Sequence, residues 1–270
     1  MLFKHPLRCI VYYLGLKKKL QHTIRHSMKH LREDVKQIAV EFNEDAIHDL
    51  RTDFKKIRAL LRWLGAKKNV YKPFDRIYDR AGLLRDIQVV NRFVDVVDSK
   101  YPEAFTVWLL HLEIHAMENW YGVNHKKVFK KMGGKLDKIK PVIHTRAFFS
   151  TRVKKIKNII YSYPISDENM HSVRKMSKDM QYLLLWMDKE AEPNEPSRLF
   201  HLKLLKQIAR QIGDYNDRCI LLQFLTAYKY CQTEQAAILE IEPIIENQIL
   251  ENELEKDRLI TSLRVTWLLL

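Results

Sequence analysis

Basic and protonatable side chains recur at helical spacing in one segment, IHDLRTDFKKIRALLRWLG, which spans residues 47–65. Successive members of this series are three or four positions apart, so an α-helix would place them all on one face. None of them is acidic, and Asp49 and Asp53 fall beside the stripe rather than on it. The members are His48, Arg51, Lys55, Arg58 and Arg62.

These residue types suit a repeating anion. Arginine offers a planar fork for bidentate phosphate contact, lysine offers a point charge, and histidine adds a donor whose charge depends on pH near neutrality. Neighbouring members would lie roughly one helical turn, or about 5 Å, apart along the axis. The alternative is an ordinary solvated basic face. Because like charges at i, i+4 cost about 0.2–0.5 kcal/mol per pair, a bound anion would offset a real repulsion.

The same pattern recurs elsewhere in the chain. Residues 16–42 combine an apolar stripe with a cationic one, and we expect this helix to form a wall beside the first strip. In the second half, His171, Arg174 and Lys178 each follow His48, Arg51 and Lys55 by 123 residues, which indicates an internal repeat. The cationic residues of 16–42 are Lys18, His22, Arg25, Lys29, Arg32 and Lys36.

Other candidate sites are weaker. His22, His26 and His30 share a helical face, but the arginines and lysines between them would repel a metal cation. His111, His115 and Glu118 could also hold a divalent metal, although partly buried structural histidines are the alternative there. The sequence contains no glycine-rich phosphate loop, no recognisable Ser-His-Asp set and no carboxylate cluster for Mg²⁺.

Two acids occupy similar places in the two halves. The pattern predicts that Asp86 begins an apolar helix after Gly82, and that Asp217 begins another after Gly213. One interpretation is that each acid favours the positive end of a helix. The other is that each acid orients a basic residue of the anion-binding groove without contacting the anion itself.

Composition limits the possible partners. Lys and Arg outnumber Asp and Glu by 47 to 33, which gives a formal charge of +14 and favours an anionic partner. Three cysteines without ligand spacing are typical of a reducing compartment, and the apolar run before KKK is too short to span a bilayer. We therefore expect a cytoplasmic protein that uses no membrane and no cofactor.

The elements are expected to be helical throughout. Only 7 Gly and 8 Pro occur, no Asn-Gly or Asp-Gly hairpin signal is present, and long segments show the 3.6-residue period. A helix after Pro102 is expected to reach Met132, where Gly133-Gly134 would stop it. The predicted fold is all-α, with two tandem four-helix bundles related by an internal repeat: an extension at 1–15 and repeats at 16–133 and 134–270.

On these residues the chain resembles the CHAD domain family. That family's pattern of His, two residues, Arg and then a base every turn is similar to HDLRTDFKKIRALLR at 48–62 and, more weakly, to HSVRKMSKDMQY at 171–182. Its two turn motifs are similar to RDIQV at 85–89 and to IGDYND at 212–217. The resemblance implies one all-helical CHAD-like unit that binds inorganic polyphosphate in a basic groove or cavity without catalysis. Gln88, Asp179 and Gln181 depart from the pattern, which implies a weaker second patch.

The predicted binding residues therefore lie on helices of both repeats. Asp86 and Asp217 would support them, and no residue is assigned a catalytic or metal-binding role. We expect association with polyphosphate granules and a separate polyphosphate-metabolising enzyme as a further partner. The alternatives are a nucleic-acid-binding helical protein and a metal-dependent phosphohydrolase built on His111, His115 and Glu118. The predicted binding set comprises the strip at 48–62, the wall at 18–32 and a second-half set. The second-half set is His171, Arg174, Lys175, Lys178, Lys203, Lys206 and Arg210.

Overall fold

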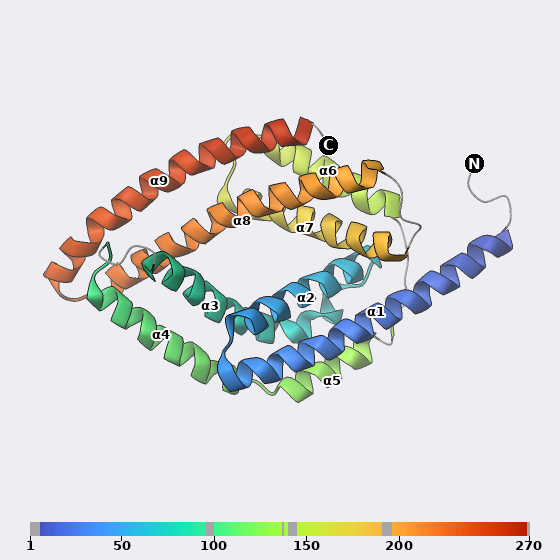
Figure 1. The fold of residues 1–270 in the computed structure, drawn as a ribbon, viewed down its shortest axis with the longest axis horizontal. Helices are drawn as coiled ribbons and strands as arrows, with labels where there is room; N and C mark the ends of the chain where they lie inside the picture. The colour runs from blue at the N-terminus through green and yellow to red at the C-terminus, as the bar shows by residue number, and fades with distance from the viewer. Residues whose placement is uncertain (1–5, 96–99, 137, 140–144, 191–195, 269–270) are drawn as a thin grey trace. The chain divides into compact units, whose positions relative to one another are not determined.

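The structure is a computed structural model that describes residues 6–95, 100–136, 138–139, 145–190 and 196–268. All regular structure in these ranges is helical, which confirms the predicted all-α class (Figure 1). The elements are α1 (Pro6–Glu41), α2 (Glu44–Trp63), the 3₁₀ turn η1 (Lys68–Val70), α3 (Lys72–Asp95), α4 (Glu103–Tyr121), α5 (His125–Leu136), α6 (Thr145–Ile160), α7 (Asp167–Glu190), α8 (Pro196–Cys231) and α9 (Gln235–Leu268).

Contacts divide the chain into two compact units. The first comprises Met1–Ala81 and Val123–Ile143, and the second comprises Gly82–Gly122 and His144–Leu270. The first unit is discontinuous in sequence because the segment that carries α5 returns to it. The assignment of 16–133 and 134–270 as two sequence repeats stays a prediction.

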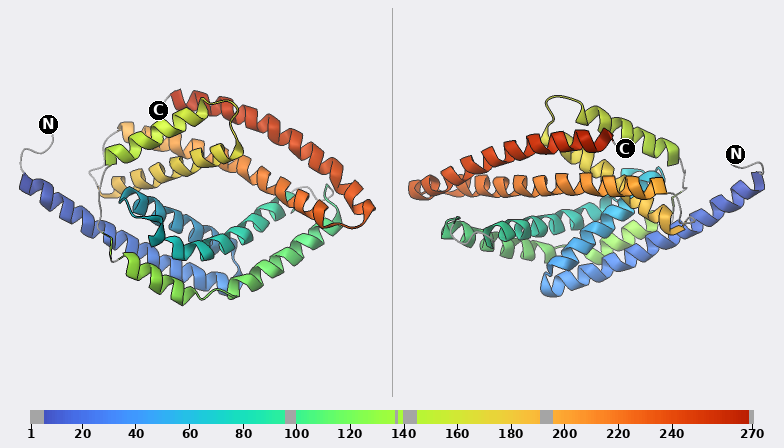
Figure 2. Two further views of the ribbon diagram at one scale, coloured as in Figure 1. Left: turned by 180° about the vertical axis from the view of Figure 1, so that it is seen from behind. Right: turned by 45° about the horizontal axis from the view of Figure 1, so that its top comes forward.

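In the first unit, α1 and α2 pack against each other as neighbours joined by a two-residue turn (Figure 2). Asn43 caps α2, since its Oδ1 accepts from the backbone N–H of Asp45 at 2.8 Å and of Ala46 at 3.4 Å. The other end of α2 is closed by Gly65, whose φ of 69° is a conformation that glycine adopts without a Cβ clash. These two signals fix the ends of the helix that carries His48, Arg51, Lys55, Arg58 and Arg62, which we call the α2 strip.

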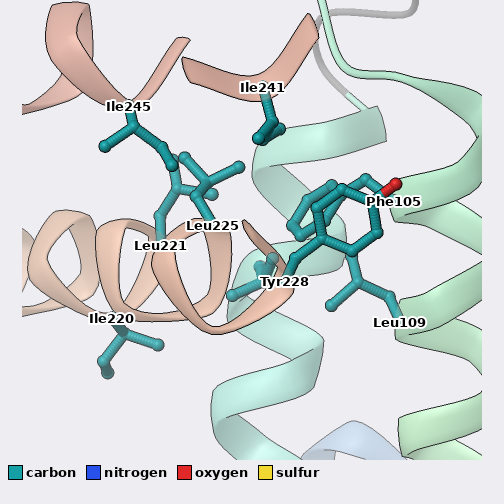
Figure 3. Packing of buried hydrophobic residues seen from close by; sticks show 9 residues of the cluster. Phe105, Leu109, Ile220, Leu221, Leu225, Tyr228, Ile241 and Ile245 are labelled. Carbon is teal, nitrogen blue, oxygen red and sulfur yellow. The ribbon is translucent and has the colours of Figure 1, made fainter. Parts of the chain in front are cut away.

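The second unit is organised around the long helix α8, which packs on α7 and on α9 (Figures 1 and 2). One core cluster joins α3, α4, α8 and α9, and Figure 3 shows the ring of Phe105 from α4 beside that of Tyr228 from α8. The two ring centroids are 5.3 Å apart in an edge-to-face arrangement, which suits the quadrupoles of both rings. The other members are Val90, Leu109, Ile220, Leu221, Leu225, Ile241 and Ile245.

Four predicted helix boundaries were wrong, and the first of them is the start of α1, which begins at Pro6 rather than at residue 16. α3 continues through Gly82 and α8 continues through Gly213, because buried apolar residues keep their helical spacing on both sides of each glycine. A helical glycine costs only about 1 kcal/mol relative to alanine, so packing overrides it. The helix after Pro102 ends at Tyr121, and a new helix, capped by Asn124, then runs through Gly133-Gly134.

Candidate functional site

Tyr78 of α3 brings two arginines of the α2 strip together. Arg51 donates from Nη1 to the Tyr78 carbonyl at 3.0 Å, and its guanidinium carbon lies 4.5 Å from the centre of the Tyr78 ring. Arg58 lies over the same ring at 5.1 Å and over the Phe54 ring at 5.4 Å. Cation–π contacts of this kind hold a guanidinium in place without neutralising its charge.

The surroundings of this pair are mixed in charge. Burial and the nearby Asp75 raise the pKa of Asp79, whereas Arg51 and Arg58 act to lower it. The Nε atom of Arg58 is buried and donates to no acceptor among the described residues. His48 is exposed, and Lys55 and Arg62 are partly exposed on the same helix. The α2 strip therefore forms one face, on which α3 positions the two central arginines.

The predicted wall on α1 leads to a different neighbour. Lys18, His22, Arg25, Lys29 and Arg32 are all exposed, and the guanidinium of Arg32 lies 5.5 Å from the centre of the Phe129 ring of α5. The contacts of Arg32 therefore point to α5, whereas those of Arg51 and Arg58 point to α3. A joint role of the two strips in anion binding stays a prediction.

An acidic group lies instead between α1 and α2. Burial, together with Asp53 and Asp49 of α2, raises the pKa of Asp34 on α1 from 3.8 to about 6. His30 acts in the opposite direction on the same group. These carboxylates come from both helices of the packed pair and are close enough to interact.

The second unit has its own cationic cluster. Arg174 of α7 donates from Nε to the carbonyl of Ala209 on α8 at 3.3 Å. The guanidinium lies so close to Gly213 that a Cβ there would be 3.3 Å from Nε and from Nη2. Burial, Arg174 and Lys206 together lower the pKa of Lys178, so the structure brings these three predicted cations within electrostatic range.

The remaining predicted residues of this unit lie nearer solvent. His171, Lys175 and Lys203 are exposed, and Arg210 faces Asp214 on the next helical turn at 3.9 Å. An exposed pair at that separation contributes little to stability. The second-half set is therefore divided between the cluster around the half-buried Arg174 and Lys178, which the exposed Lys206 joins, and a solvated surface.

The two arginine anchors occur at similar places in the two halves of the sequence. Arg51 and Arg174 are 123 residues apart, and the carbonyls that they bind, of Tyr78 and Ala209, are 131 residues apart. In both halves a glycine follows the accepting residue by four positions, which is one helical turn: Gly82 and Gly213. The two anchors thus share a local pattern, and the repeat itself stays a prediction.

Asp86 and Asp217 lie in the middle of α3 and α8, so the interpretation that they begin helices was wrong. Both contact Arg85, whose Nη1 donates to Asp86 at 3.1 Å and whose Nη2 donates to Asp217 at 2.6 Å. The basic residue that both acids contact was absent from the predicted set, and their role in supporting anion binding stays a prediction. The RD pair inside the RDIQV motif was the signal that could have identified Arg85.

Asp179 stands where the CHAD pattern often has a base, and the structure explains this difference. This residue is buried, and its Oδ2 accepts from Nη2 of Arg152 on α6 at 3.2 Å. The same guanidinium lies 3.3 Å from the centre of the Phe148 ring. A base at position 179 would leave Arg152 beside a second buried cation, which the low dielectric of the interior penalises.

In the part of the chain that the structure describes, no group of three or more His, Cys, Asp or Glu side chains is placed to hold a metal ion. Of the proposed set on α4, Nδ1 of His115 lies 3.5 Å from Oε2 of Glu118, and both side chains are exposed. Among the same residues, no helix is both long enough and apolar enough to cross a bilayer.

Comparison with known proteins identifies the architecture. No family model matches the chain, and no curated protein matches it. Among solved structures, the crystal structure of the CHAD domain from the plant Ricinus communis is similar, with a TM-score of 0.72 at 12% sequence identity. The similarity covers 94% of this chain and 91% of that one. The chain therefore has a CHAD-like, all-α fold.

Proposed function

We propose that this protein binds inorganic polyphosphate without hydrolysing it. The observation that carries the proposal is the duplicated anchor, in which Arg51 and Arg174 each donate to a backbone carbonyl of another helix in the same unit. Each anchored arginine lies near further cations, Arg58 in one unit and Lys178 in the other. The CHAD-like fold is compatible with this role.

Anchoring matters because a flexible arginine loses conformational entropy when it binds a ligand. Contact with a carbonyl and a ring fixes the position of Arg51 before an anion arrives and leaves its positive charge in place. The guanidinium of Arg58 is likewise held over the rings of Tyr78 and Phe54 and keeps its positive charge beside Arg51. The α2 strip extends over about 20 Å of helix, which gives room for several phosphoryl groups.

The first test is calorimetric titration with long-chain polyphosphate over a range of salt concentrations. We expect log Kd to rise linearly with log salt, with a slope of several units if each neutralised phosphate contributes somewhat less than one, as in nucleic acids. The triple variant Arg51→Glu/Lys55→Glu/Arg58→Glu should lose binding while circular dichroism shows unchanged helicity. Unchanged affinity in that variant would exclude the α2 strip.

A matched control separates a specific site from the general field of a basic protein. Lys154, Lys155 and Lys157 lie exposed on α6 outside the predicted set, and replacing all three by Glu changes the net charge equally. We expect this control to weaken binding by less than about threefold, because surface charges act weakly through screened solvent. Equal losses in both triple variants would refute a localised site.

The cationic cluster of the second unit should contribute less to polyphosphate affinity than the α2 strip. Lys178→Glu combined with Lys206→Glu removes two members of its cluster while Arg174 remains anchored. Because Asp179 and Gln181 are buried acidic and neutral residues that add no cation to this patch, we expect a smaller loss than in the α2 strip variant. A larger loss would reverse the predicted order of the two patches.

The absence of catalysis and the choice of polyanion are tested separately. We expect no release of orthophosphate from polyphosphate when Mg²⁺ or Mn²⁺ is added, and metal-dependent release would favour the phosphohydrolase alternative. Competition between polyphosphate and single-stranded RNA at equal phosphate concentration should favour polyphosphate. Stronger competition by RNA would favour the nucleic-acid alternative.

The same proposal extends to the cell. A polyphosphate-binding protein without catalysis would act at stores of the polymer, so we propose a cytoplasmic protein associated with polyphosphate granules. It would work beside a separate enzyme that metabolises the polymer. Fluorescence imaging should show the wild-type protein at granules and the triple variant of the α2 strip dispersed.

A further inference from the structure

A second basic site lies within the first unit, between α1 and α5. It is a groove of about 670 Å³, and five of the residues that line it are cationic or protonatable. None of the described lining residues carries a carboxylate. The five are Arg32, Lys36, His125, Lys126 and Lys130. Only Arg32 belongs to the polyphosphate-binding set proposed from the sequence.

The floor of the groove is apolar. Val35, Val123 and Phe129 line it and are 5%, 6% and 4% exposed, and Ala39 completes it. The guanidinium of Arg32 lies over the ring of Phe129 at 5.5 Å, so this cation is held at the wall of the groove. A ligand that fits must therefore combine an anionic group for the rim with an apolar part for the floor.

The start of α5 adds to the positive potential. This helix begins at His125, which lines the groove, and its first turn is capped by Asn124, whose Oδ1 accepts from the N–H of Lys127 at 2.9 Å. The amino-terminal end of a helix carries a partial positive charge and attracts phosphate. Here it coincides with lysines from the same helix and with cations of α1.

The cations are arranged compactly. Arg32 and Lys36 are one turn apart on α1, and Lys126 and Lys130 are one turn apart on α5. Each pair therefore extends over about 6 Å of helix, compared with about 20 Å for the α2 strip. Four cations within so short a length suit several phosphoryl groups on one small molecule better than an extended polymer.

From these observations we propose that the α1–α5 groove binds a nucleoside triphosphate, with the phosphates between the lysines and arginine of the two helices and the nucleoside against the apolar floor. This site is separate from the polyphosphate-binding strip. Arg32 and Lys36 contact the phosphates from α1, and Lys126 and Lys130 contact them from α5.

The lysines of α5 allow a matched test. Lys126 and Lys130 line the groove, whereas Lys127 and Lys131 lie one position further along the same helix and do not line it. All four are exposed, so charge reversal should leave the fold intact. The double variants Lys126→Glu/Lys130→Glu and Lys127→Glu/Lys131→Glu then differ in position but not in net charge or helix.

We would titrate both variants and the wild-type chain with ATP by calorimetry in about 0.15 M salt. We expect the groove variant to bind ATP at least about tenfold more weakly and the control to change by less than about threefold, because only the groove lysines contact the phosphates directly. Equal effects in both variants, or no measurable ATP binding by the wild type, would overturn the proposal.

Two further measurements complete the design. Inorganic tripolyphosphate carries phosphates without a nucleoside, so we expect it to bind more weakly than ATP, and equal affinity would overturn the assignment to a nucleotide. Long-chain polyphosphate should still bind the groove variant within about threefold of the wild type. A loss there as large as that in the α2 strip variant would show one continuous site and overturn a separate one. Lys36→Glu on α1 repeats the test if the α5 variant unfolds.

Discussion

Asp34 offers a sharp test of the electrostatics of the first unit. Its Oδ2 atom is buried and accepts no hydrogen bond from the described residues, and two carboxylates of α2, Asp53 and Asp49, lie nearby. Burial is the largest cause that raises the pKa of Asp34 from 3.8 to about 6, and the two α2 acids follow. The ionised side chain is therefore unfavourable in the folded state, and we predict that Asp34→Asn stabilises the protein at neutral pH.

The magnitude follows from linkage. A change in pKa from 3.8 to about 6 corresponds to about 3 kcal/mol, since each tenfold change in proton affinity is worth about 1.4 kcal/mol. Asp34 is only partly buried, and solvent screening reduces this value to about 1–2 kcal/mol. The raised pKa favours folding fully below pH 3.8, and the benefit is lost as the pH rises through about 6.

Asparagine resembles the protonated carboxyl group in shape and charge. We therefore expect Asp34→Asn to have little effect on the free energy of unfolding near pH 4 and to raise it by about 1–2 kcal/mol at pH 8. Urea denaturation at pH 4, 5, 7 and 8 would measure the difference. Glu41→Gln, at an exposed position of the same helix, serves as the control and should change stability by less than about 0.5 kcal/mol at every pH. A gain that does not vary with pH, or a loss at pH 8, would refute the reasoning.

Three further predictions concern the second unit. Gly213→Ala should be nearly neutral alone, because the gain in helix propensity of up to about 1 kcal/mol is offset by crowding of Arg174, and should stabilise by about 0.5–1 kcal/mol in an Arg174→Ala background. A double-mutant cycle in urea measures this coupling. Arg85→Met should destabilise by about 1–3 kcal/mol at pH 7, measured by urea denaturation, because it leaves the half-buried Asp217 without its partner. Leu225→Ala removes a side chain with 0% exposure and should cost about 2–5 kcal/mol, measured by chemical denaturation.

Patterns local to the chain were sufficient for the fold class and for the position of the strips. The 3.6-residue period of the apolar residues predicted helices, and Asn43 and Gly65 marked the ends of α2. These signals could be interpreted without the structure because a helix is stabilised by contacts between residues three and four positions apart. Gly82 and Gly213 were misleading because helix propensity is also a local signal. The free-energy cost of a helical glycine there is smaller than the stabilisation that the long helices gain from packing.

The sequence by itself determined that the protein is helical and basic, and it located the rows of cations on α1, α2 and α7. Only the tertiary structure decided what those cations contact. Tyr78, Phe129 and Ala209 are the partners of Arg51, Arg32 and Arg174, and each partner lies on another helix, remote in sequence. Periodicity reports which face of a helix a side chain occupies, but the helix that packs on that face depends on the topology. Burial, charge proximity and grooves arise only when those helices meet.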